Sequence, residues 1–267
     1  MFRNISVNRK IWISVGVLSL ISSVIGVLEP SIYDKVVSSD IMPGVFGQDL
    51  MTVPVSILVI GLALRIKERN YIKQILVLGL VGFFFYAYGI YVIEQIYTPL
   101  YYIYLAIFGL SSYSIVYSLV SFRGNIVEKI KIPKAIRGSS AAYSLLIAGI
   151  FTALWIGSLY PQISSGERLD YLYSIYILDL CFIMPAFAIG AIKALKKRKS
   201  GLLFLPALFV LGSPLIGSLA LAEGLKPLKY GMGMDVGLFG INMVVSGIFT
   251  VLAVLYLWKL KVRYSSS

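Results

Sequence analysis

Two aspartates inside long apolar stretches are the residues of this chain best placed to do chemistry. Asp49 lies in "QDLMTVPVSILVIG" (48–61) and Asp179 lies in "YILDLCFIMPAFAIG" (176–190). A carboxylate in such a stretch is costly, and it often marks a site for a cation, a proton or a substrate amine. The structural alternative is that each carboxylate caps its helix or accepts hydrogen bonds from nearby Tyr and Ser hydroxyls.

Two glutamates and four prolines accompany these aspartates. Glu94 and Glu223 each come just before a turn between apolar stretches, where they either join an acidic ligand site or are simply solvated. A proline inside a helix removes a backbone hydrogen bond and kinks the helix, and the freed carbonyls can line a cavity or bind ions. The prolines inside apolar stretches are Pro54, Pro185, Pro206 and Pro214. Membrane-spanning helices also tolerate proline without any functional role.

The residue types that are missing exclude several kinds of catalytic and metal site. The chain has no histidine, which is the commonest metal ligand and general base. Cys181 is the only cysteine, so a disulfide framework or a Cys-based metal site is excluded. No phosphate-binding glycine motif and no nucleophile–base pair is visible. We therefore assign no catalytic residue, no metal site and no cofactor, and a membrane-embedded enzyme is the least favoured function.

The composition predicts an all-α integral membrane bundle, with the lipid bilayer as its partner. Of 267 residues, 58% are hydrophobic and 13% are charged, whereas soluble proteins carry roughly 25% charged residues. Eight apolar runs approach the roughly 20 residues that cross a bilayer. These runs are 11–28, 46–64, 74–93, 100–121, 141–160, 171–192, 201–222 and 237–258.

The positions of the cations predict the orientation. When the eight runs alternate in direction, all but a few of the 24 Lys and Arg fall on one side. The exceptions are Lys35, Arg168, Lys226 and Lys229. The positive-inside rule places the cation-rich side in the cytoplasm. We therefore expect a multi-pass protein of the plasma membrane with both termini cytoplasmic, and we interpret the net charge of +12 as a topology signal rather than a nucleic-acid surface.

An internal repeat relates the two halves of the chain. "IGVLEP" (25–30) is similar to "IGSLYP" (156–161), and the offset of 131 residues recurs between Pro54 and Pro185. The two aspartates follow the same offset within one residue. Four crossings in each copy return the chain to its starting side. The copies would therefore be parallel and related by an axis along the membrane normal, as in some transporters.

The repeat predicts how the chain is divided. We expect a first four-helix half at 1–122, a basic cytoplasmic linker at 123–140 and a second four-helix half at 141–267. The linker is expected to contain a short amphipathic surface segment. Asp49 and Asp179 each lie about 25 Å from the cytoplasmic end of their helix at 1.5 Å per residue. In a symmetric arrangement the two carboxylates could therefore face one outward-opening cavity.

Aromatic residues are concentrated around one outer turn. The stretch is "FFFYAYGIYVIEQIYTPLYYIYLAIFG" (83–109). Because Tyr prefers the boundary between membrane and water, we interpret this stretch as an interfacial aromatic belt. A pocket for a quinone or a lipid is the alternative.

Several segments resemble those of a known but uncharacterised group of proteins. They are "FGQDL" (46–50), "FYAYGIY" (85–91), "YYIYLAIFGLSSY" (101–113) and "YILDLCFIMP" (176–185). The chain resembles a family of polytopic, about eight-helix prokaryotic membrane proteins with no established activity. The resemblance implies the architecture and supplies no catalytic residues.

Two functions follow from these observations. The favoured one is transport or binding of a small solute or ion through an outward-facing acidic cavity that includes Asp49 and Asp179. The alternative is a non-catalytic accessory, scaffold or sensor subunit of a membrane complex.

Overall fold

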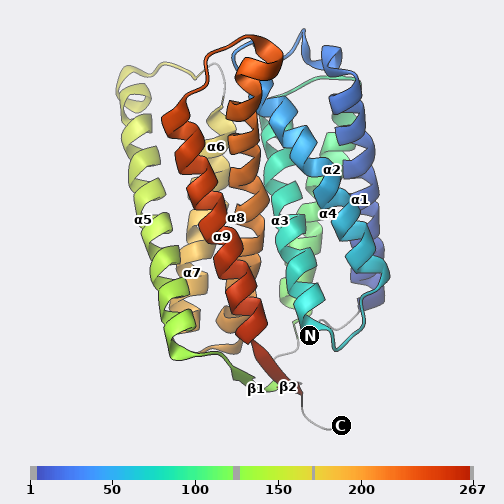
Figure 1. Ribbon diagram of the computed structural model, residues 1–267, viewed down its shortest axis with the longest axis vertical. Coiled ribbons are helices and arrows are strands. Elements are labelled where there is room, and N and C mark those ends of the chain that lie inside the picture. The colour runs from blue at the N-terminus through green and yellow to red at the C-terminus, as the bar shows by residue number, and fades with distance from the viewer. Residues whose placement is uncertain (1–4, 123–126, 170–171, 265–267) are drawn as a thin grey trace.

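The computed structural model describes residues 5–122, 127–169 and 172–264, most of which are helical (Figure 1). Among these residues, eight spans are long and apolar enough to cross a membrane, which confirms the predicted number. The spans are α1 (Ile5–Leu28), α2 (Met42–Leu64), α3 (Tyr71–Ile93), α4 (Tyr101–Val120), α5 (Lys134–Ser165), α6 with η2 and α7 (Tyr173–Leu178, Asp179–Ile183 and Met184–Leu195), α8 with η3 (Lys199–Leu225 and Lys226–Tyr230), and α9 (Val236–Lys259). The chain is therefore a multi-pass helical membrane protein.

Successive spans run in opposite directions through one bundle, so α1 begins and α9 ends at the same end of it (Figure 1). We call this the basic end, and it comprises the described residues at 5–10, 65–70, 127–137, 193–202 and 259–264. The opposite, outer end comprises the described residues of the connections at 29–41, 94–100, 166–169 with 172, and 226–235. The predicted alternation of the eight spans agrees with this arrangement.

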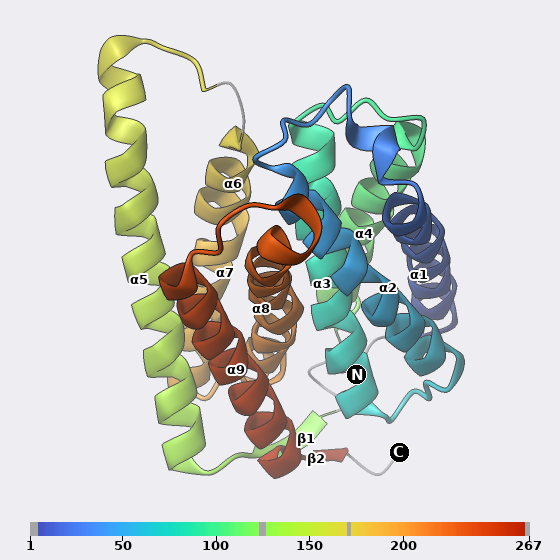
Figure 2. The same ribbon diagram turned by 45° about the horizontal axis from the view of Figure 1, so that its top comes forward.

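The helix α3 is the centre of the bundle. Within its apolar span 83% of the residues are buried, against 17% for both α5 and α9. It packs against α2, α4 and α8. Figure 2 shows α5 at one edge of the bundle and α1 at the other, with α3 between them. Residues on α3 can therefore contact both halves of the chain.

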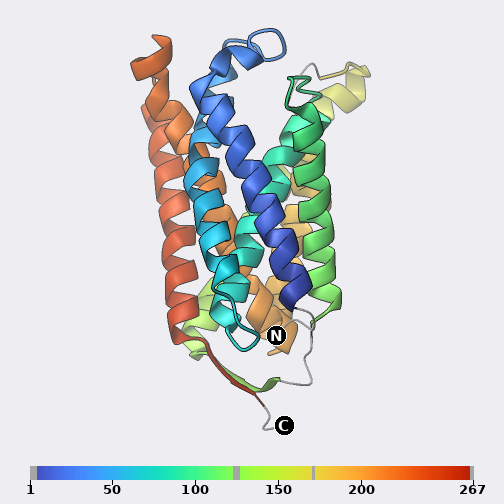
Figure 3. The ribbon, with the colours of Figure 1, turned by 90° about the vertical axis from the view of Figure 1, so that its right-hand side faces the viewer.

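The helices pair in the same order in each half. In the first half α1 packs on α2 and α3 packs on α4, while α1 and α4 also touch, as Figure 3 shows. In the second half α5 packs on α7 and α8 packs on α9. The halves meet where α8 contacts α2 and α3. This contact is close because Gly47 and Gly79 have no side chain: an added Cβ would lie 2.8 Å from Ser218 O and 2.5 Å from Ala207 O, respectively.

Pro185 accounts for a local change of helix type in the sixth span. The π-helical turn η2 (Asp179–Ile183) comes directly before α7, whose second residue is Pro185. Proline has no N–H for the carbonyl four residues earlier, so the preceding turn widens. Pro54 lies inside α2, Pro206 and Pro214 lie inside α8, and both helices continue past them.

A small antiparallel sheet at the basic end corrects the predicted linker. The strand β1 (Val127–Lys131) pairs with β2 (Lys261–Tyr264). The helix α5 already begins at Lys134, before the predicted start at residue 141. The expectation of an amphipathic surface segment at 123–140 is therefore wrong for the described residues, and 123–126 lie outside them. A short strand forms its hydrogen bonds with a partner strand, and the partner of β1 lies near the other end of the chain. The local sequence of β1 therefore does not indicate that it forms a strand.

Candidate functional site

Asp49 is buried within α2, and both of its carboxylate oxygens accept hydrogen bonds. The exposed fraction of this residue is 2%. Tyr33 Oη donates to Oδ2 at 2.6 Å, and Tyr91 Oη donates to Oδ1 at 3.1 Å. A hydroxyl donor on each oxygen partly replaces the water that the carboxyl group loses on burial. These hydrogen bonds agree with the structural alternative stated in the sequence analysis, in which the carboxylate accepts hydrogen bonds from nearby hydroxyl groups.

A chain of hydroxyl groups continues from Asp49 toward the outer end. Tyr33 Oη lies 3.2 Å from Tyr104 Oη, and Thr98 Oγ1 donates to Tyr104 Oη at 3.2 Å. The rings of Tyr91 and Tyr104 pack edge to face with centroids 5.0 Å apart. We call these residues, Asp49, Tyr33, Tyr91, Tyr104 and Thr98, the Asp49 cluster.

Separate segments of the first half bring the Asp49 cluster together. The 3-10 turn η1 (Pro30–Tyr33) returns the outer loop to the bundle, where Tyr33 is buried. The helix α1 closes the cluster at Gly26, where an added Cβ would lie 2.0 Å from Asp49 Oδ2. Burial raises the pKa of the Tyr33 hydroxyl far above its ordinary value. Tyr33 therefore stays protonated and remains a donor to the carboxylate.

A second polar layer lies next to the Asp49 cluster on the side of the basic end. Tyr88 Oη lies 2.6 Å from Ser22 Oγ and donates to Ser19 O at 3.1 Å. Gln48 Nε2 donates to Ala87 O at 3.1 Å. These hydrogen bonds join α1, α2 and α3 next to Asp49. The hydroxyls of Ser22 and Tyr88 and the amide of Gln48 are thus paired within the bundle.

Asp179 is also buried, in η2, with an exposed fraction of 5%. Trp155 Nε1 of α5 donates to Asp179 Oδ2 at 2.6 Å. The hydroxyl of Tyr86, on α3, interacts with the same carboxylate. Trp155 is held in turn by Tyr176, whose ring packs edge to face on the indole at 5.4 Å. Aromatic donors therefore surround the second aspartate as well as the first.

The two aspartates contact α3 on different sides. Asp49 contacts Tyr91 and Asp179 contacts Tyr86, and residues five apart are turned by roughly 140° about a helix axis. Five cavities of about 260 to about 650 Å³ among the described residues are lined by residues other than these aspartates. The structure thus brings both carboxylates to one helix and places each in its own hydrogen-bonded cluster.

Glu94 and Glu223 are engaged within the protein, so the expectation that they are simply solvated is wrong. Glu94 accepts hydrogen bonds from the backbone N–H groups of Leu172 at 2.9 Å and Ser174 at 2.7 Å, at the start of α6. Glu223 is buried and pairs with Lys226 at 2.5 Å. Glu94 therefore connects the outer end of α3 to the second half of the chain.

The interfacial belt predicted for 83–109 is wrong for the tyrosines of the site. Tyr88, Tyr91 and Tyr104 are buried in the core of the bundle, whereas Tyr97 and Tyr102 are exposed. A Tyr ring packs as well in a helical core as at the membrane boundary, provided that its hydroxyl finds a partner. The Asp49 cluster supplies those partners to Tyr91 and Tyr104.

Sequence reasoning missed three residues that complete these sites: Tyr33, Gly26 and Trp155. Tyr33 belongs to an outer loop, and loop residues carry no periodicity that reveals where they pack. Gly26 lies in the first copy of the repeated motif (25–30), and Trp155 directly precedes the second copy (156–161). The repeated motif was therefore the available signal for two of the three.

The chemistry of the Asp49 cluster suits a proton or a small cation. It offers one carboxylate among several hydroxyl oxygens, and buried carboxylates of this kind serve as proton and ion sites in membranes. Across the described residues, no group of three or more His, Cys, Asp and Glu could hold a metal ion.

Comparison with protein-family models, curated proteins and solved structures finds no match for this chain. The resemblance to an uncharacterised prokaryotic membrane family therefore stays a prediction.

Proposed function

We propose that the protein binds or transports a small solute or ion, and that Asp49 is the binding position. The bound species would be a proton or a small cation that enters from the outer side. The observation that carries the proposal is the run of hydroxyls from Thr98 through Tyr104 and Tyr33 to Asp49. Each hydroxyl can donate to the next group, so a proton that enters near Thr98 can pass along the hydrogen bonds to the carboxylate.

The burial of Asp49 supports a functional role for its carboxylate. A carboxylate in a membrane-spanning helix is costly and tends to mark a proton or ion pathway. Paired buried polar groups are weak evidence for stability, because apolar residues of similar volume often stabilise a fold equally well. A role in stability alone therefore does not account for an Asp at this position.

We infer that the two halves are tandem copies, with Asp179 as the counterpart of Asp49. The shared offset of 131 residues and the same order of helix pairing in each half support this inference. Asp179, with Trp155 and Tyr86, would then form a second binding position on the other side of α3.

The expected orientation is part of the proposal. The basic end would lie in the cytoplasm of the cell, with both termini, and the Asp49 cluster would open outward through the connection at 94–100. The concentration of Lys and Arg at the basic end supports this orientation.

A non-transporting subunit of a membrane complex remains the second candidate. It is favoured by α5, whose span is only 17% buried and which packs on α7, η2 and α9 at one edge of the bundle. Such a helix has a wide apolar face for lipid or for another subunit. Stoichiometric recovery of a partner from native membranes, with no solute flux by the purified chain, would favour this candidate.

Reconstituted protein tests the transport proposal. Liposomes with a pH-sensitive dye inside are given an inward proton gradient, and the measurement is repeated with an equal sodium gradient. Asp49→Asn should abolish most of the flux. Asp40→Asn, which removes an exposed carboxylate from the same outer side, should leave it unchanged. Equal flux in the two variants, or no flux above empty liposomes for the wild type, would overturn the proposal.

A further inference from the structure

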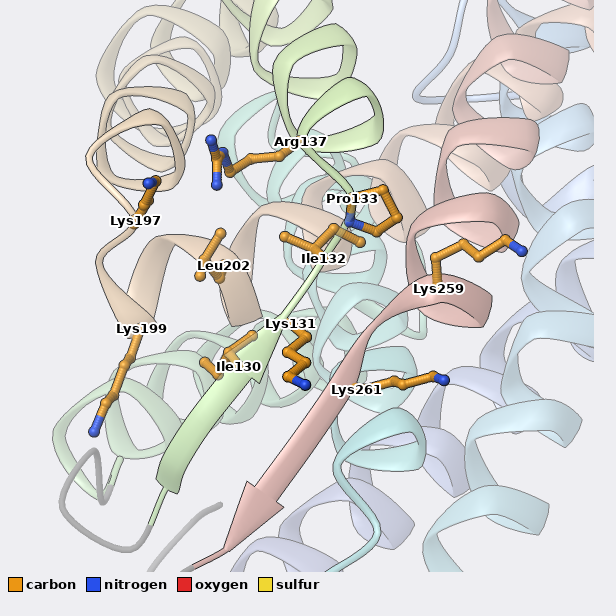
Figure 4. Close-up of a pocket in the computed structure, with 10 residues that line it drawn as sticks. All are labelled: Ile130, Lys131, Ile132, Pro133, Arg137, Lys197, Lys199, Leu202, Lys259 and Lys261. Atoms are coloured by element: carbon orange, nitrogen blue, oxygen red, sulfur yellow. The ribbon is translucent and has the colours of Figure 1, made fainter.

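A cavity of about 650 Å³ at the basic end is lined by cations from distant parts of the chain (Figure 4). The cavity lies where β1, the start of α5, the turn from α7 to α8 and the end of α9 meet. Its cations are Lys131, Arg137, Lys197, Lys199, Lys259 and Lys261. The other lining residues are apolar, so no carboxylate belongs to the lining.

The strand pairing brings like charges together at this cavity. Lys131 of β1 is directly opposite Lys261 of β2, and both line the cavity. Like charges at directly opposite positions of a strand pair destabilise the pairing. With a negatively charged group in the cavity, the two lysines would stabilise the strand pairing instead of destabilising it.

Two helices begin at the cavity, and neither has a side-chain cap. The residue before α5 is Pro133 and the first residue of α8 is Lys199, and both residues line the cavity. In the described part of the chain, the residues at the two N-cap positions, Pro133 and Arg198, accept no side-chain hydrogen bond from the first-turn N–H groups. A helix start carries a partial positive charge and N–H groups without intrahelical partners, so it attracts anions.

Arg137 supplies an unused donor at the same place. Its Nε is buried and has no hydrogen-bond partner among the described residues. Figure 4 shows the side chain extending from α5 toward the turn that carries Lys197. A buried guanidinium nitrogen without an acceptor is costly, and an anion between Arg137 and Lys197 would satisfy it.

We propose that this cavity binds the phosphate group of an anionic ligand. A phosphate carries up to two negative charges and several acceptor oxygens, which match an Arg fork, Lys ammonium groups and helix N–H groups together. Ile130, Ile132 and Leu202 supply an apolar wall for the organic group that carries the phosphate. The phosphate belongs either to an anionic lipid headgroup, because the cavity lies at the ends of membrane-spanning helices, or to a soluble phosphate compound.

The test uses the full chain in neutral detergent. Its thermal unfolding midpoint is followed during titration with short-chain phosphatidylglycerol, with short-chain phosphatidylcholine, and with inorganic phosphate. The pocket variant is Arg137→Gln with Lys197→Gln. The control variant is Arg65→Gln with Lys67→Gln, which removes the same charge from the same end of the bundle but outside the cavity.

We expect phosphatidylglycerol to stabilise the wild type and the control, and to bind the pocket variant roughly tenfold more weakly, since two charge-assisted contacts are lost. Stabilisation by inorganic phosphate as well, with the same loss in the pocket variant, would identify a soluble source. If the double variant does not fold, Lys197→Gln alone replaces it, because Lys197 is exposed on a turn. Equal binding by the pocket and control variants would overturn the proposal. So would the absence of binding of both phosphatidylglycerol and inorganic phosphate.

Discussion

Tyr33 Oη donates a 2.6 Å hydrogen bond to Asp49 Oδ2, and this bond joins an outer loop to a carboxylate inside a membrane-spanning helix. The loop between α1 and α2 therefore contributes Tyr33 to the Asp49 cluster. The bond also explains why Tyr33, outside the eight spans, is buried.

Tyr33→Phe should destabilise the fold by about 1–3 kcal/mol, because it removes one donor from a buried carboxylate. Unfolding in mixed micelles of mild and denaturing detergent measures the change. Tyr102→Phe is the matched control, since Tyr102 is 84% exposed and its hydroxyl should contribute less than about 0.5 kcal/mol. Equal losses in the two variants would contradict the role given to Tyr33.

The stability of the protein should fall at alkaline pH through Tyr33. Burial holds the pKa of its hydroxyl far above the value of about 10 for an unfolded chain. Its contribution is therefore complete below about pH 10, and above that pH the unfolded state loses a proton that the folded state keeps. The loss is about 1.4 kcal/mol per pH unit. Tyr33→Phe should flatten the slope of unfolding free energy against pH by this amount, and parallel slopes would refute the assignment.

Gly26→Ala should cost about 1–3 kcal/mol through overpacking, because the new methyl group would lie 2.0 Å from Asp49 Oδ2. Gly109→Ala, inside α4, is the control. An added Cβ there meets nothing within 4 Å, so alanine should be neutral or stabilising by about 0.5–1 kcal/mol. The same unfolding assay compares the two. A neutral Gly26→Ala would show that α1 does not close the cluster as described.

Glu94→Ala should destabilise the fold by about 1–3 kcal/mol for each backbone N–H left without its acceptor at the start of α6. Glu167→Ala removes an exposed carboxylate from the same end and should have little effect. Limited proteolysis near residue 172 provides a second measurement, since the connection to α6 should open in the Glu94 variant. Unchanged proteolysis would argue against a capping role for Glu94.

Thiol labelling tests the proposed orientation. In a Cys181→Ser background, Asp40→Cys should react with a membrane-impermeant maleimide on intact cells, whereas Lys67→Cys should react only after the cells are opened. Both positions are exposed, at opposite ends of the bundle. The native Cys181 must be removed because it is itself exposed. The reverse pattern of labelling would place the basic end outside.

The spans could be predicted because each one must bury a long run of apolar residues in lipid. The run at 46–64, for example, corresponds to α2 at Met42–Leu64, and the run at 171–192 corresponds to the span Tyr173–Leu195. Their ends were less certain, because a helix such as α5 continues beyond the apolar run into polar residues.

The site was predictable only in part. An Asp among apolar residues is visible in a sequence, so Asp49 and Asp179 stood out. Their partners were not visible: Tyr33 reaches Asp49 through the tertiary packing of a loop, and Trp155 reaches Asp179 from another helix. The basic cavity was hidden for the same reason, since its cations come from β1, α5, the turn between α7 and α8, α9 and β2, which only the tertiary fold brings together.

The pairing of β1 with β2 also has a mechanical consequence. β1 precedes α5 and β2 follows α9, so the ladder fastens the first and last helices of the second half to each other. Backbone hydrogen bonds therefore link the two ends of the second half. In the first half, α1 and α4 are joined by side-chain contacts, such as the hydrogen bond from Trp12 to Ser114. A force applied to the carboxyl terminus would have to break the hydrogen bonds between β1 and β2 before it could pull α9 out of the bilayer.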